Sequence, residues 1–217
     1  MKRGTKYDTK NLVESHFEPG SGQRVLKNLL KIRHKRVMDE REAQEQLRTL
    51  DKMASLYNED HVFVADDIRH IHRIWLRGIY PWAGEYRQVN ISKGGFSFAA
   101  AAHIPALMKE FERNVLTQRT PCRANASEEI IESLAVVHVE LVLIHPFREG
   151  NGRMARLLSI AMGWQAKLPT LDFGGIVGKK KNEYFAAVQA GMKHNYIPMK
   201  LVFESVVART LKNIKSS

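Results

Sequence analysis

An apolar helix that stops at a glycine-rich turn constrains the fold of this chain more than any other feature. The longest apolar run extends from Leu134 to Ile144, interrupted only by His138 and Glu140, and leads into His145 and Pro146. Proline disfavours helical backbone at the residue before it, so the helix has to end at His145. The glycines of Gly150-Asn-Gly152 then allow backbone conformations that other residues avoid. This stretch therefore predicts two helices joined by a short turn.

The spacing of the apolar residues predicts helices in most of the remaining chain. Ser127 is the expected N-cap of the apolar helix, with Glu128 and Glu129 in its first turn. The helix after the glycine turn is expected to end near Gly163. The other expected helices cover residues 37–57, from about 65 to a breaker at 80–84, 104–116, 182–194 and 198–214.

One stretch has the alternation of a β-hairpin instead. Val89 and Ile91 alternate with polar neighbours before Lys93-Gly-Gly95, and Phe96 and Phe98 alternate after it. A period of two on both sides of a Gly-Gly turn is typical of a hairpin. We therefore predict an all-α fold, a helical bundle with one β-hairpin.

Length and charge limit the organisation and the partners. The 217 residues suit one main domain, expected at 59–217, preceded by an N-terminal segment and helix at 1–58. The net charge is +11, from 34 Lys and Arg against 23 Asp and Glu. Such a surface attracts polyanions, but composition alone favours a basic and unspecialised surface.

The sequence also predicts a cytoplasmic protein with no membrane partner. Cys122 is the single cysteine, so an internal disulfide is impossible and a reducing compartment is expected. Residues Met1–Lys10 lack the apolar core of a secretory signal. The apolar run Leu134–Ile144 is too short to span a bilayer.

The residues after the apolar helix have the chemistry of a phosphate site. Free N–H groups at a glycine-rich helix start attract anions, and the helix dipole adds to this attraction. Arg153 and Arg156, expected in the first turn of that helix, are unfavourable there unless an anion offsets them, and guanidinium forks match phosphate oxygens. Glu149 would repel phosphate unless Mg²⁺ lay between them. His145, mostly neutral at pH 7, can accept a proton from an attacking hydroxyl.

Other motifs are incomplete. The chain has neither a Walker phosphate loop nor an H-E-x-x-H zinc motif. His138 and Glu140 have deaminase spacing, but the only Pro-Cys pair lies upstream and lacks its second cysteine. His138 is therefore expected to be a core residue.

The segment His145–Arg156 resembles the signature of the Fic family, H-x-F-x-[DE]-G-N-G-R-x-x-R, at every specified position. The stretches 79–87 and 89–96 are similar to the segment before the family's flap and to the flap itself. The resemblance covers roughly residues 60–205. It implies a helical bundle with a β-hairpin flap over the active site.

The resemblance also implies a protein adenylyltransferase that moves AMP from ATP to a Ser, Thr or Tyr hydroxyl of a target protein. In this interpretation His145 is the catalytic base, Phe147 is structural and Glu149 holds Mg²⁺ on the phosphates. The implied nucleotide contacts come from Gly150, Asn151, Gly152, Arg153 and Arg156, with Tyr184 either at the adenine or an ordinary helix residue, and the implied target-docking flap contains Lys93, Gly94 and Gly95.

Regulation by a separate chain is also expected. Many Fic enzymes are silenced by a helix with the pattern [ST]-x-x-x-E-[GN]; here Ser55 to Asp60 comes nearest but ends in Asp. The resemblance then implies the toxin of a toxin–antitoxin pair, with a small antitoxin supplying a glutamate to Arg156. Some bacterial relatives modify type II topoisomerases, which makes such an enzyme a candidate target.

Two alternatives stay open at this point. The motif recognises the phosphates and not the nucleobase, so the chain could transfer another nucleotide. A nucleotide- or DNA-binding module that has lost transfer is the second alternative. The basic surface supports it, and the intact His145 argues against it.

Overall fold

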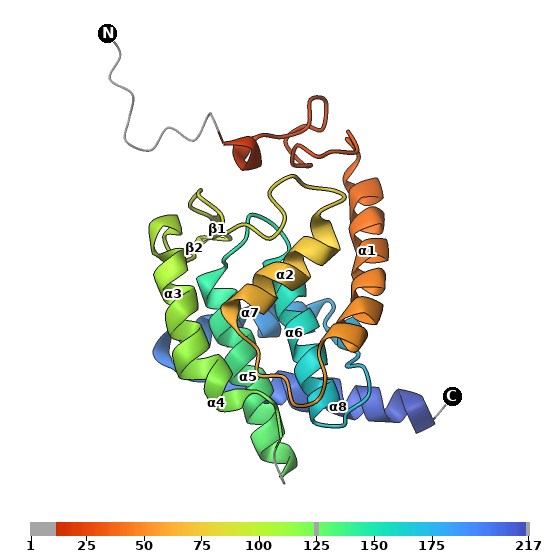
Figure 1. Cartoon of the computed structure of the whole chain (residues 1–217), viewed down its shortest axis with the longest axis vertical. Helices are drawn as coiled ribbons and strands as arrows, with labels where there is room; N and C mark the ends of the chain where they lie inside the picture. Colours follow the sequence, from red (N-terminus) through yellow and green to blue (C-terminus); the bar gives the residue numbers. More distant parts are fainter. Residues whose placement is uncertain (1–11, 124–125, 216–217) are drawn as a thin grey trace.

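Helix α5 (Ser127–Ile144) forms the centre of the structure (Figure 1). The structure is a computed structural model and describes residues 12–123 and 126–215. From Leu134 onward almost every residue of α5 is buried, so it has no polar face. This explains why its sequence from Leu134 is an apolar run, interrupted only by His138 and Glu140, and not an amphipathic pattern. The helices packed around it are α3 (Ile104–Phe111), α6 (Asn151–Gln165), α7 (Lys179–Ala190) and α8 (Ile197–Lys215).

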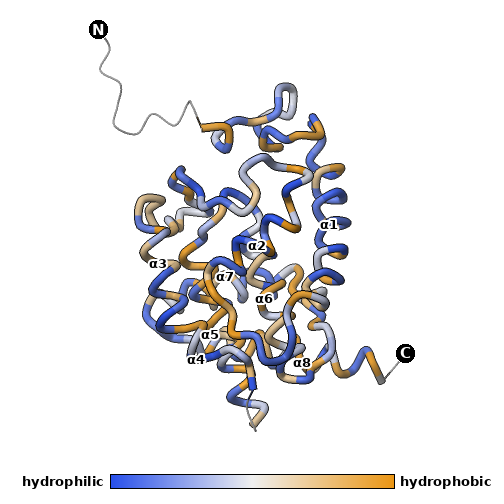
Figure 2. Tube along the Cα trace, viewed as in Figure 1, coloured by the Kyte–Doolittle hydropathy of each residue, from blue (hydrophilic) through white to orange (hydrophobic). Residues whose placement is uncertain are grey.

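Helices α1 (Lys35–Leu56) and α2 (Ala65–Leu76) pack against each other, and both reach α6. Figure 2 shows α1 mostly in hydrophilic colours, because only one face is covered. Its buried face carries Met38, Glu42 and Met53. Both helices lie where the sequence predicts them.

The helix expected at 104–116 is longer than predicted. It begins as α3, continues through a π-helical stretch η3 (Glu112–Leu116) and ends with α4 (Thr117–Arg119). The predicted N-cap of α5 is wrong by one position. Ala126, which has extended backbone, is the N-cap without a side-chain bond, and Ser127 is already helical.

The predicted hairpin is present but short. Strands β1 (Ser92–Lys93) and β2 (Phe96–Ser97) are antiparallel, with Lys93 opposite Phe96. Gly94 and Gly95 have φ values of 57° and 78°, which suits a two-residue turn with positive φ at both positions. The four strand residues and the two glycines are exposed or half-buried. Because the described sheet contains only β1 and β2, each strand has one edge without a strand partner.

The segment before α1 is irregular but packed. It contains the short helix η1 (Val13–Ser15) and an isolated bridge between Phe17 and Leu26, and Val25 and Leu26 are buried. The predicted absence of a secretory signal concerns Met1–Lys10, which lie outside the described residues. The remaining short elements are η2 (Ala101–His103), η4 (Phe173–Gly175) and η5 (Gly191–Lys193). No helix in the described parts of the chain is both long and apolar enough to cross a membrane.

Two histidines are fully buried in this core. His72 on α2 accepts a hydrogen bond at Nδ1 from the Gly84 N–H (2.8 Å), so its Nε2–H donates to the Glu149 carbonyl (3.2 Å). His138 on α5 bonds Ser159 Oγ (3.1 Å) and Tyr184 Oη (2.8 Å). Burial lowers the pKa of each imidazole to about 3. His138 is therefore a core residue, as predicted.

These two histidines make stability depend on pH. Unfolded histidine has a pKa of about 6.5, so unfolding takes up one proton per imidazole between pH 6.5 and the lower folded value. The contribution of these histidines to the free energy of unfolding is fully present above pH 6.5. Below that pH the free energy of unfolding falls, with a slope approaching about 1.4 kcal/mol per pH unit for each histidine. Urea denaturation between pH 5 and 7 measures this slope.

In the variant His138→Gln the pH dependence of the unfolding free energy should decrease by the contribution of one histidine. In the exposed control His34→Gln it should stay unchanged. A slope unchanged in His138→Gln would contradict the proposed burial of neutral histidine.

Candidate active site

The turn between α5 and α6 needs left-handed backbone at both ends. His145 has φ 53° and ψ 58° and ends α5. Gly150 has φ 83° and is the N-cap of α6. A Cβ atom at Gly150 would lie 2.7 Å from Cζ3 of Trp75, so both the conformation and the space require glycine there.

Asn151 closes this turn with its side chain. Its Oδ1 accepts from the Phe147 N–H and its Nδ2 donates to the Phe147 carbonyl, both at 2.8 Å. Phe147 is fully buried and stacks on His72, with 3.8 Å between ring centroids. Phe147 is therefore structural, as the resemblance implies. The Asn151 side chain is thus engaged in holding the turn, and its backbone N–H remains available for an anion.

The first turn of α6 presents backbone N–H groups to a cavity. The N–H groups of Asn151, Gly152 and Arg153 precede the first intrahelical bond, which runs from the Met154 N–H to the Gly150 carbonyl (2.8 Å). The cavity has a volume of about 750 Å³. Its lining includes His145, Glu149, Gly150, Asn151, Gly152, Arg153, Arg156, Tyr184 and Lys93. Gly94 and Gly95, at the tip of the hairpin, do not line it.

The His145 imidazole is held in one orientation. Its Nδ1 lies 3.1 Å from the Val142 carbonyl, which can only accept, so the proton is on Nδ1 and Nε2 keeps a free lone pair. Phe98 of the hairpin stacks on the ring, with 3.6 Å between centroids. Burial lowers the His145 pKa to about 4. The ring is therefore neutral at pH 7 and able to accept a proton.

Arg156 is a cation that pairs with no acidic side chain among the described residues. Its guanidinium lies 5.5 Å from the ring centre of Phe173 and 5.7 Å from that of Tyr184. Its Nε is buried and has no hydrogen-bond partner within the described structure. The prediction that Arg156 lies in the first turn of the helix is wrong: α6 begins at Asn151, so Arg156 lies in its second turn. A guanidinium held by ring faces has its charge available for an anionic ligand.

Arg153 differs, because the protein itself supplies its anion. Its Nη1 lies 2.6 Å from Oε2 of Glu42 and its Nη2 3.3 Å from Oε1 of Glu149. Glu42, only 2% exposed, also accepts from the Tyr80 hydroxyl (2.7 Å). The prediction that an external anion offsets both arginines is thus incomplete for Arg153. Sequence reasoning missed Glu42, although an acidic residue on the apolar face of α1, four residues after Met38, was a signal.

Glu149 keeps one oxygen free. Oε1 accepts from the Gly150 N–H (2.9 Å) and contacts Arg153, whereas Oε2 has no partner among the described residues. The side chain is 44% exposed and lines the cavity. A single carboxylate oxygen in this place fits a divalent cation that is held mainly by substrate oxygens.

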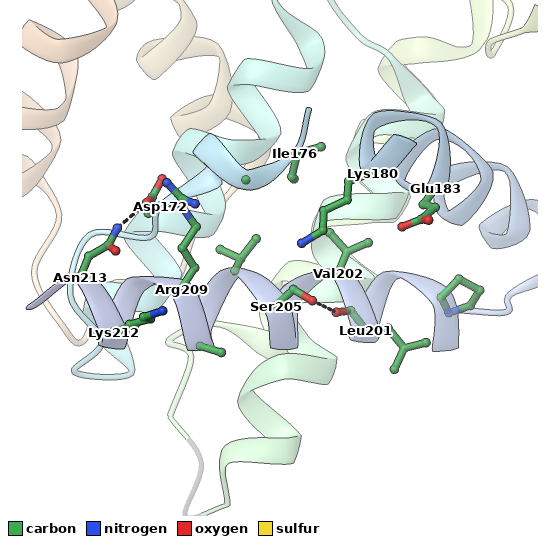
Figure 3. Close-up of a pocket in the computed structure, with 14 residues that line it drawn as sticks. Asp172, Ile176, Lys180, Glu183, Leu201, Val202, Ser205, Arg209, Lys212 and Asn213 are labelled. Carbon is green, nitrogen blue, oxygen red and sulfur yellow. Dashed lines mark hydrogen bonds and ion pairs between the residues drawn. The ribbon is translucent and has the colours of Figure 1, made fainter. Parts of the chain in front are cut away.

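A second cavity, of about 620 Å³, lies along α8 (Figure 3). There Arg209 pairs with Asp172 (2.6 Å), and Asn213 also donates to that carboxylate (2.8 Å). None of the predicted site residues lines it. Volume alone does not separate the two cavities, and the histidine, the helix start and the unpaired arginine assign the chemistry to the first.

Comparison with known proteins gives the family. The model of the Fic/DOC family matches residues 62–162. "Probable protein adenylyltransferase Fic" of Escherichia coli K12 is 30% identical over 149 residues, which cover 65% of this chain and 68% of the relative. "Protein adenylyltransferase Fic" of Culex quinquefasciatus is 27% identical over 164 residues, 73% of this chain. This chain spans only 30% of the length of that insect relative.

Solved structures agree. The N-terminal Fic domain of a VirB-translocated Bep effector protein from Bartonella quintana has 27% identity and a TM-score of 0.70, covering 94% of this chain and 98% of that one. A Bartonella quintana Fic domain with bound ADP gives 27% identity and a TM-score of 0.69, covering 88% and 94%. The predicted helical bundle with one hairpin is confirmed. With its signature turn, its fold and its relatives all in agreement, this chain belongs to the Fic/DOC family.

Proposed function

We propose that this chain is a protein adenylyltransferase that transfers AMP from ATP to a hydroxyl side chain of another protein. The observation that carries the proposal is the neutral His145, whose Nε2 lone pair is free and lines the same cavity as the N–H groups of α6. Relatives named as adenylyltransferases and a related domain with bound ADP support the nucleotide. Tyr184 lines this cavity and is a candidate contact for the adenine of ATP.

In the proposed reaction the target hydroxyl attacks the α-phosphorus of ATP. Its proton passes to His145 Nε2, a new P–O bond forms, and the bond to the β-phosphate oxygen breaks to release pyrophosphate. The N–H groups of Asn151, Gly152 and Arg153 stabilise charge on the phosphates. Arg156, which has no carboxylate partner in the described chain, binds the terminal phosphate.

The hairpin is proposed to hold the target. A target segment could add as a strand to a free edge of β1 or β2, which would fix its backbone near the cavity. Lys93 reaches from the hairpin toward α7, where its Nζ lies 5.6 Å from the ring centre of Phe185. Lys93, Gly94 and Gly95 therefore form the proposed docking edge.

Replacing His145 by Ala should lower AMP transfer by about 10²–10⁴-fold, the usual contribution of a general base. The affinity for a non-hydrolysable ATP analogue in the presence of Mg²⁺ should stay nearly constant, because residues other than His145 contact the phosphates. The assay uses ATP labelled at the α-phosphate, with a bacterial lysate and a purified type II topoisomerase as acceptors.

Parallel reactions with labelled GTP, CTP and UTP test the alternative of another nucleotide. Near-normal transfer by His145→Ala would refute the mechanism. Absence of transfer by the intact chain with every nucleotide would favour a binding module.

Glu149 is proposed to hold Mg²⁺, which when bound neutralises phosphate charge. Replacing Glu149 by Ala should reduce the difference between nucleotide affinities measured with and without Mg²⁺. Calorimetric titration of the ATP analogue measures both affinities. Glu183, an exposed acid on α7 outside this cavity, is the matched control (Glu183→Ala). An unchanged difference in Glu149→Ala would remove this residue from the metal role.

We also propose that a partner chain regulates the enzyme by supplying a glutamate to Arg156. Glu59 is the residue of this chain that best matches the glutamate of the inhibitory pattern, but it pairs with Lys167. Lys167 follows the C-terminal end of α6, whereas Arg156 lies near its N-terminal end. An incoming carboxylate would take the place of the terminal phosphate and form a charge-assisted pair.

Cytoplasmic expression of this chain in bacteria should therefore stop growth, and the protein encoded beside it should restore growth. Growth curves on induction measure this, with His145→Ala as the inactive control. Toxicity retained by His145→Ala would contradict the catalytic explanation. Silence of the purified chain that is relieved by Glu59→Gly would place the inhibition inside the chain.

A further inference from the structure

Arg87 is a cation that is almost completely enclosed. It lies between α2 and β1, outside the predicted site, and only 1% of it is exposed. Its guanidinium makes four hydrogen bonds, and all four acceptors are backbone carbonyls. Nε donates to His145 (2.7 Å), Nη1 to Val89 (2.7 Å), and Nη2 to Ala99 (2.6 Å) and to Ile144 (3.4 Å).

These acceptors belong to two functional parts. Val89 and Ala99 lie just outside the two strands of the hairpin, so Arg87 ties the two ends of the flap together. Ile144 and His145 end α5, where the catalytic base sits. The Arg87 backbone N–H also donates to the Pro146 carbonyl (2.9 Å). One residue thus joins the base of the flap to the backbone of the proposed catalytic histidine.

Guanidinium chemistry explains why arginine occupies this place. Its planar group carries five N–H donors with fixed directions, which can serve carbonyls on several sides at once. The last carbonyls of α5 lack helical partners and carry the negative end of the helix dipole, so they favour a cation. Burial lowers the pKa of Arg87, while the nearby Glu14 carboxylate raises it. Glu14 itself accepts from the Gln88 N–H (2.6 Å).

We infer that Arg87 is a positioning residue that fixes the target-docking hairpin relative to the catalytic base. This inference rests on the proposed function. A target strand held on the hairpin has to bring its hydroxyl to His145 Nε2, and a misplacement of about 1 Å can cost on the order of 10²-fold in rate. Phe98, stacked on the His145 ring, adds a second contact between the same two parts.

The variants Arg87→Lys and Arg87→Gln test the inference. Lysine keeps the charge as a compact point without the planar fork, and glutamine keeps two donors without the charge. Arg73→Gln is the matched control, because Arg73 pairs with Glu85 (2.8 Å), which lies two residues before Arg87 in the chain. Three quantities are measured. They are kcat for labelled AMP transfer to lysate proteins, Kd for the ATP analogue in the presence of Mg²⁺, and hydrogen–deuterium exchange along the chain.

Both Arg87 variants should lose about 10²-fold in kcat while Kd changes less than about threefold. Exchange should rise together in residues 88–100 and 141–147 but stay unchanged in α2 and α8. The Arg73 variant should resemble the parent protein in all three.

Three results would overturn the inference. One is normal transfer by Arg87→Lys. Another is exchange that rises throughout the chain, with Kd lost in parallel, which is the pattern of a merely structural residue. The third is loosening of the hairpin alone, with residues 141–147 unchanged.

Measurements on the intact chain cover the case in which neither variant folds. The Arg87 Nε–H should show a scalar coupling across its hydrogen bond to the His145 carbonyl, and it should exchange with solvent together with the Phe98 amide of the hairpin. Independent exchange of these two protons would overturn the inference. Because exchange needs no target, a chain that transfers nothing would refute the proposed function while leaving the Arg87 contacts testable.

Discussion

The pair of hydrogen bonds between the Asn151 side chain and the Phe147 backbone is the constraint on which the site depends. It holds the turn closed, so α6 starts directly beside the end of α5. Gly150, packed against Trp75, allows this approach. The free N–H groups of one helix and the histidine that ends the other therefore line one cavity. In the proposed reaction, phosphate binding and proton removal would therefore take place side by side.

Three arginines near this turn differ in function because their partners differ. Arg87 is buried among carbonyls and holds backbone segments in place. Arg153 is neutralised by Glu42 and Glu149, so its side chain supports the wall of the cavity. Arg156 lies between aromatic rings and has no carboxylate partner in the described chain. Residue type alone does not distinguish these roles, whereas the distance to the nearest anion does.

The part of the site that is contiguous in sequence could be predicted, and the part that is assembled from distant segments could not. His145, Glu149 and the glycines lie within one motif, so their local backbone effects were readable. Glu42 lies on α1 and meets Arg153 across more than a hundred residues of chain. The extension of the helix at 104–116 through α4 to Arg119 and the one-residue shift of the α5 N-cap also escaped prediction, because local signals place helix ends only to within a few residues.

The sequence by itself determined the helical class, the hairpin and the chemistry of the turn. Proline, glycine and apolar spacing act over a few residues, and those effects do not need the rest of the chain. Only the tertiary structure decided which side chains face one another. It set the tautomer of His145 through Val142, stacked Phe98 on that ring and gave Arg153 its carboxylates, whereas Arg156 has none among residues 12–123 and 126–215. The physical reason is that burial and charge partners depend on distances through space, which a linear pattern does not contain.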